Sequence, residues 1–74
     1  MANKVITSFQ NHAADRCIDI FVRDDGTFGF EEYRRDHEDE SEWFSLHRFS
    51  HLVFDTEERA LAEARSTVEW MIGA

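Results

Sequence analysis

The most reactive side chains in this 74-residue chain are one cysteine and four histidines. Zinc sites combine such residues at short spacings, as in C-x-x-C or in H-x-x-x-H on a helix. His47 and His51 are four residues apart, but the pattern around them predicts a strand and a connecting segment rather than a helix. The other candidates, Cys17, His12 and His37, are distant in sequence. We therefore expect no metal site and no cofactor.

Nucleophilic catalysis by a cysteine requires a histidine base within hydrogen-bonding reach of the thiol. The sheet expected below places Cys17 and His47 at opposite ends of one face, with a strand between them. The paired carboxylates at 31–32 and 57–58 are adjacent in sequence. Neighbours on a strand point to opposite faces, and the second pair flanks a helix start, so neither pair forms an acid/base site. The sequence thus predicts a protein that is not an enzyme.

The element that positions most of these residues is a β-hairpin over residues 17–36. Its two apolar runs are joined at 24–26. A two-residue turn would place a glycine and a glutamate on the face of the aliphatic row. A three-residue loop, closed by Gly26 in the left-handed conformation, instead pairs Val22 with Phe28. The inward side chains are then Ile18, Ile20, Val22, Phe28 and Phe30, and the outward ones are Asp19, Phe21, Arg23, Gly29, Glu31 and Tyr33.

A third strand is predicted over residues 43–48, antiparallel to the second and in the register that sets Tyr33 opposite Trp43. Before it, residues 36–42 predict a solvated acidic loop. After it, residues 49–54 lack a regular alternation. We expect them to connect the sheet to a helix, with Phe49, Leu52, Val53 and Phe54 closing one end of the core.

The N-terminal residues 1–15 are expected to be loosely ordered. Their apolar run at 5–9 is short and β-compatible, so it could dock as an edge strand or as a cover over the sheet. The folded domain is expected to span residues 16–74.

The C-terminal part, residues 55–72, predicts a helix. Asp55 is suited to the N-cap, Glu58 follows three residues later as in a capping box, and Gly73 ends the pattern. An apolar stripe at helical spacing comprises Leu61, Ala64, Val68 and Ile72, with Ala60 and Met71 beside them, and Trp70 falls on the other side. The prediction is an α+β domain of order β-β-β-α, a three-stranded antiparallel meander with one helix on one face.

Composition limits the function classes. Sixteen acidic and eight basic residues give a formal charge of −8, which opposes binding to nucleic acid or to anionic membranes. One cysteine cannot form an internal disulfide, and neither a signal peptide nor a long apolar run is present. We expect a small cytoplasmic protein.

Three motifs resemble a family of small, functionally uncharacterised bacterial proteins: GTFGFEEYRRD at 26–36, Trp43-Phe44, and FSHLVFDTEERALAEA at 49–64 followed by Trp70. The resemblance implies the same β-β-β-α domain and no catalytic residue. Three strands followed by a DTEE-x-A segment at 55–60 also resemble antitoxin domains of the HicB type, although the chain has no proline and so lacks their proline-bearing loop.

The functional hypothesis concerns large side chains without an evident cover. They would lie on the outer face of the sheet and on the side of the helix that faces away from the sheet. Aromatic residues commonly anchor interfaces. We expect a non-enzymatic interaction or self-association module that forms a homodimer or binds an unidentified protein partner. An antitoxin-like inhibitor of a basic partner is the second hypothesis, and a metal-binding protein or enzyme is the third. The expected surface comprises Phe21, Tyr33, Trp43, His47 and Trp70.

Overall fold

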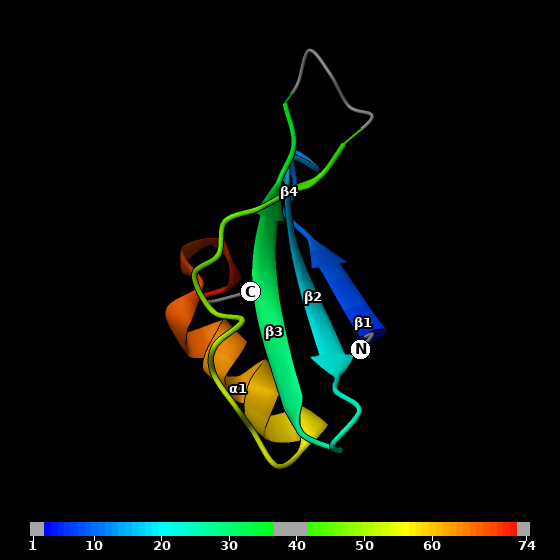
Figure 1. Ribbon diagram of the computed structural model, residues 1–74. Helices are drawn as coiled ribbons and strands as arrows, with labels where there is room; N and C mark the ends of the chain where they lie inside the picture. Colours follow the sequence, from blue (N-terminus) through cyan, green and yellow to red (C-terminus); the bar gives the residue numbers. More distant parts are fainter. Residues whose placement is uncertain (1–2, 37–41, 73–74) are drawn as a thin grey trace.

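The computed structural model describes residues 3–36 and 42–72 and confirms the predicted α+β class. An antiparallel sheet in the order β1-β2-β3-β4 has its helices on one face (Figure 1). The strands are β1 (Lys4–Gln10), β2 (Arg16–Val22), β3 (Phe28–Arg34) and β4 (Phe44–Ser45), followed by helix α1 (Glu57–Thr67) and a short 3₁₀ helix, η1 (Glu69–Met71).

The hairpin between β2 and β3 has the predicted register along its whole length. Gly26 closes the three-residue loop at φ +86°, and its N–H donates to the carbonyl of Arg23 over 3.0 Å. Gly29 allows a close cross-strand approach, because a Cβ at this position would lie 2.9 Å from two ring carbons of Phe21. The ring therefore lies against the glycine, which is opposite Phe21 in the strand pairing.

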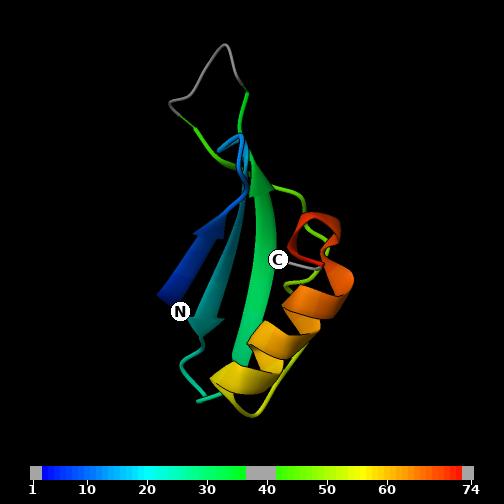
Figure 2. The ribbon, with the colours of Figure 1, turned by 180° about the vertical axis from the view of Figure 1, so that it is seen from behind.

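Strand β1 pairs antiparallel with β2 and forms one edge of the sheet. The apolar run at 5–9 was expected to dock either as an edge strand or as a cover over the sheet. It is an edge strand (Figure 2). A register shift between Val5 and Thr7 marks a bulge, and beyond it Phe9 lies opposite Ile18 and packs against the core. The sheet is therefore larger than the predicted meander by one N-terminal strand.

The third predicted strand, 43–48, is wrong in length and in register. Strand β4 has two residues, and Ser45 instead of Trp43 lies opposite Tyr33. His47 has φ +52°, a left-handed conformation that breaks the extended path of the chain. The backbone N–H groups that follow bond to a carboxylate of β3 instead of to a strand, as described below.

The segment 46–54 connects the sheet to α1; the sequence predicted this connection for 49–54 and placed 46–48 in the third strand. It runs beside β3, from a bond between the N–H of Leu46 and the carbonyl of Glu32 to a two-way bridge between Phe54 and Phe28. Three of its apolar side chains pack against the core: Phe49, Leu52 and Phe54. Val53 was expected among them, but it is 64% exposed.

Helix α1 begins later than predicted. The N-cap is Thr56 rather than Asp55, and its hydroxyl accepts the N–H of Arg59 over 3.1 Å. Asp55 instead forms an ion pair of 3.5 Å with the side chain of Arg59. Thr56 has the extended backbone that an N-cap needs.

The helix also ends earlier than predicted. Val68 has an extended backbone, with φ −79° and ψ 118°, so the chain turns at this residue and continues as η1. The turn directs both Val68 and Met71 into the core, whereas Ile72, predicted to belong to the apolar stripe, is 59% exposed.

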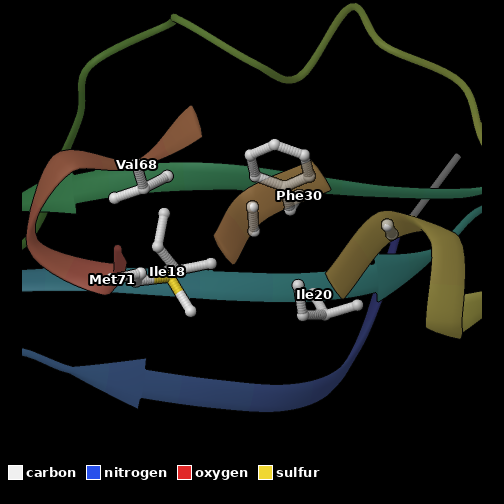
Figure 3. Close-up of a cluster of buried hydrophobic side chains, with 7 residues drawn as sticks. Ile18, Ile20, Phe30, Val68 and Met71 are labelled. Atoms are coloured by element: carbon white, nitrogen blue, oxygen red, sulfur yellow. The ribbon is translucent and has the colours of Figure 1, made fainter. Parts of the chain in front are cut away.

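The core lies between the sheet and α1 (Figure 3). Phe30 is fully buried at its centre, and its ring stacks on Phe49 with 5.0 Å between centroids. Burial of such side chains supplies most of the folding free energy of a domain this small. The buried cluster comprises Ile18, Ile20, Phe30, Ala60, Ala64, Val68 and Met71.

Replacement of Gly26 by valine should destabilise the domain by roughly 1 to 2 kcal/mol, because a β-branched residue is strained at positive φ. A Cβ at this position would meet no described atom within 4 Å, so the cost is one of backbone conformation and not of a clash. Gly26→Asn is the matched control, since asparagine tolerates the left-handed region. Thermal melts should rank wild type and Gly26→Asn above Gly26→Val; equal melts for both variants would contradict this origin of the cost.

Candidate functional site

The predicted aromatic surface is not assembled as one patch. Phe21 is only 4% exposed, because the guanidinium of Arg23 lies over its ring at 5.0 Å from the centroid. The same guanidinium reaches across the sheet and donates to the carbonyls of Ser50 and Leu52, over 2.8 and 2.9 Å. This end of the outer face is therefore closed by an arginine side chain.

The other outer-face candidates lie at the far end of the sheet. Tyr33 is half-buried, and burial raises the pKa of its phenol, with further contributions from nearby carboxylates. Trp43 is half-buried beneath the guanidinium of Arg35, which lies 4.6 Å from its ring centroid. His47 is exposed in the turn after β4. Tyr33 and Trp43 remain partly accessible, but each has a protein neighbour.

Trp70 lies on the opposite side of the sheet from these residues. Its indole N–H donates over 2.9 Å to Glu32, a carboxylate that is 4% exposed on the inner face. Its other partners are Arg48 at 3.4 Å and Arg16 at 4.0 Å. Trp70 is thus a structural partner of a buried charge rather than part of an outer patch.

A second buried carboxylate, Glu31, organises the segment after β4. One of its oxygens accepts the N–H groups of Glu32 and Arg48, over 2.8 and 3.1 Å. The other accepts those of Phe49 and Ser50, over 3.1 and 2.9 Å. Glu31 is 1% exposed, and although burial alone would raise the pKa of its carboxyl, these four N–H donors lower it below its ordinary value.

The segment 46–54 is therefore held by two opposite charges. Glu31 takes up its backbone donors at 48–50, and Arg23 satisfies its backbone acceptors at Ser50 and Leu52. Both side chains project from the hairpin. A connecting segment without helix or strand hydrogen bonds thereby acquires a fixed path beside β3.

The residues with the greatest reactivity do not converge. In the described ranges, no group of three or more His, Cys, Asp and Glu side chains could hold a metal ion. The thiol of Cys17 is buried and donates to Asp19 over 3.2 Å; burial, with this hydrogen bond, raises the pKa of Cys17 to about 12, so the thiol is protonated at neutral pH. His51 is exposed, and His37 lies outside the described residues.

A groove of about 620 Å³ lies on the helix side of the sheet, between the β1–β2 turn and the end of the helical segment. Its apolar side chains are Phe9, Trp70 and Met71. Its polar and charged lining residues are Gln10, Asn11, His12 and Arg65, and the small residue Ala13 completes the lining.

The sequence predicted neither this groove nor the roles of Glu31 and Arg23. The alternation of the strands places the side chains of Glu31 and Arg23 on the outer face of the sheet, but it does not indicate that the segment 46–54, distant in sequence, binds them. Comparisons with protein-family models, curated proteins and solved structures each gave no match.

Glu31→Gln should lower the stability at pH 7 by about 2 to 3 kcal/mol, because an amide cannot accept four N–H groups and leaves buried donors unpaired. The folded pKa of Glu31 is lowered, so its contribution is complete above the unfolded value of about 4.3 and is lost as the pH falls through the folded pKa. Urea unfolding of wild type and variant should therefore differ at pH 7 and converge in acid.

Glu69→Gln is the matched control for this measurement, since Glu69 is exposed. It should change stability by no more than about 0.5 kcal/mol. A constant difference between wild type and Glu31→Gln down to the lowest pH at which both fold would show that the carboxylate charge is not what holds the segment.

Trp70→Phe should cost about 1 to 3 kcal/mol, because it removes the indole donor of the buried Glu32 carboxylate. Trp43→Phe keeps a ring beneath Arg35 and should cost less than about 0.5 kcal/mol. Denaturant unfolding followed by far-ultraviolet circular dichroism compares the two. Equal losses would contradict a specific role for the Trp70–Glu32 bond.

Proposed function

We propose that this chain is a non-enzymatic protein-interaction module that adds a strand from a second copy, or from a protein partner, to the open edge of β1. The observation that carries the proposal is the position of β1 at the end of the sheet order, paired with β2 on one side. An edge strand presents a row of backbone donors and acceptors to a further strand.

The backbone groups available for pairing follow from the register. The N–H of Asn11 donates to the carbonyl of Arg16 on β2. Alternate residues of a strand direct their backbone N–H and C=O groups to the same side, so those of Phe9 and Thr7 also point toward β2. Ser8 and Gln10 therefore direct their backbone N–H and C=O groups to the open edge. Near the other end of the strand, Val5 and Ile6 are 50% and 39% exposed, which adds apolar contact area to the same edge.

Charge supports this edge over the rest of the surface. Residues 1–14 contain no Asp or Glu, whereas all sixteen acidic residues lie between Asp15 and the C-terminus. Two copies that each carry a charge of −8 repel one another, and β1 itself has no acidic side chain, although Glu57 and Asp19 accept hydrogen bonds from Thr7 and Ser8. Self-association through β1 should therefore strengthen as added salt screens the remaining repulsion.

Tyr33 on β3 and Trp43 before β4 are partly exposed, but they lie toward the β4 side of the sheet, away from the β1 edge. Phe21 and Trp70 contribute less than the sequence suggested, because one is buried and the other lies on the helix side. Among the described residues, no helix is long and apolar enough to cross a membrane. The net charge argues against nucleic acid as the partner.

A second candidate function is inhibition of a basic partner protein, in the manner of an antitoxin. The helical segment supports it: five acidic residues there are exposed, against two arginines, Arg59 and Arg65. The acidic residues are Asp55, Glu57, Glu58, Glu63 and Glu69. Binding of this kind should weaken as salt increases, the opposite of the salt dependence expected for association through β1.

Ser8→Pro tests the leading proposal, because proline removes an N–H that faces the open edge and is tolerated on edge strands. Ser8→Ala is the matched control: it also loses the hydroxyl that donates to Asp19 over 2.6 Å but keeps the edge N–H. In sedimentation velocity at low and high salt, wild type and Ser8→Ala should associate, more so at high salt. Ser8→Pro should remain monomeric.

Circular dichroism melts establish that both variants are folded. Association of Ser8→Pro equal to that of Ser8→Ala would contradict strand addition at β1. If Trp43→Ala alone abolished association, the interface would lie on the outer face instead. A wild-type chain that is monomeric at all salt concentrations, and that captures a basic protein only at low salt, would favour the inhibitor function.

A further inference from the structure

The groove between the β1–β2 turn and η1 has the features of a small-molecule site that strand addition at β1 does not use. Its volume of about 620 Å³ is within the range of ligand pockets, roughly 300 to 1,000 Å³. It opens on the helix side of the sheet, whereas strand addition occurs in the plane of the sheet.

The walls of the groove are fixed by contacts made elsewhere. The indole N–H of Trp70 is bonded to Glu32, and Met71 is 6% exposed within the core. On the opposite wall, the side-chain oxygen of Asn11 accepts the N–H groups of Asp15 and Arg16, each over 3.0 Å. A site whose walls are already ordered loses little conformational entropy on binding.

The lining combines apolar surface with positive charge. Phe9, Trp70 and Met71 provide the apolar part, and the ionisable side chains of the lining are those of Arg65 and His12. No carboxylate belongs to the described lining, although the chain has twice as many acidic as basic residues. Arg65 forms no ion pair within the described part of the chain, whereas Arg59 on the same helix is paired with Asp55.

We propose that this groove binds an apolar carboxylate of the size of a medium-chain fatty acid. Its hydrocarbon chain would lie against Phe9, Trp70 and Met71, and its carboxylate would accept hydrogen bonds from the guanidinium of Arg65. Charge complementarity selects this ligand class, because an unpaired arginine beside apolar walls stabilises an anion and disfavours a cation of the same length. His12 adds a hydrogen-bonding group at the same rim.

The chain offers a direct readout, because Trp70 lines the groove and Trp43 is the only other tryptophan. In a Trp43→Phe background, Trp70 emission is titrated with decanoate below its micelle concentration. Decanol and decylamine serve as probes of equal length that are neutral and cationic. We expect a saturable change with decanoate, weaker binding of decanol, and the weakest binding of decylamine.

Arg65→Gln in the same background should lower the affinity for decanoate about tenfold and leave that for decanol unchanged, as expected for loss of one charge-assisted contact. Arg59→Gln, also on α1 but away from the groove, should have no effect. The proposal is overturned if decanoate gives no saturable change, or if Arg65→Gln and Arg59→Gln bind it equally. A Trp70 signal that depends on protein concentration and not on decanoate would assign the groove to a second copy and would also overturn it.

Discussion

The path of the chain between the sheet and the helix depends on the carboxylate of Glu31, which accepts four backbone N–H groups from within the protein. The segment 46–54 makes few regular hydrogen bonds, so its donors would otherwise compete for water or for the edge of β3. One buried charge satisfies three of them at once and fixes where Phe49 enters the core. Apolar packing alone does not set the direction of a backbone, so this carboxylate, together with Arg23 and the Phe54–Phe28 bridge, defines the position of the cover over this side of Phe30.

The same constraint decides which surfaces are free. Arg23, the second tie of the segment, covers Phe21 and so removes it from the accessible face. Trp70 is drawn to the inner side of the sheet by Glu32. What remains open is the far edge of the sheet, where β1 continues the ladder without a following strand among the described elements. We propose the interaction surface at that edge, because Phe21 and Trp70 of the predicted aromatic surface are occupied by contacts within the fold.

The groove and the β1 edge share the acid-free N-terminal part of the chain but use different groups. The proposed strand addition would use backbone donors and acceptors at Ser8 and Gln10, whereas the proposed ligand would contact the side chains of Phe9, Arg65 and Trp70, which line the groove. Gln10 belongs to both places, because it lines the groove and directs its backbone groups to the open edge. Ligand binding and association nevertheless have separate readouts, Trp70 emission and sedimentation.

The sequence by itself determined the β2–β3 hairpin and the presence of a C-terminal helix. Alternation and Gly26 specified the β2–β3 register, because a shift of one residue would have moved Ile20 and Phe30 out of the core. Helix α1 was also evident from its apolar stripe. Only the tertiary structure decided the outcome where a residue's partner is distant in sequence. The sequence predicted that Glu31 lies on the outer face of the sheet and that Trp70 lies on the side of the helix opposite its apolar stripe. The backbone N–H groups of residues 48–50 hold Glu31, and the carboxylate of Glu32 on β3 holds Trp70. No local pattern of residues encodes such pairings.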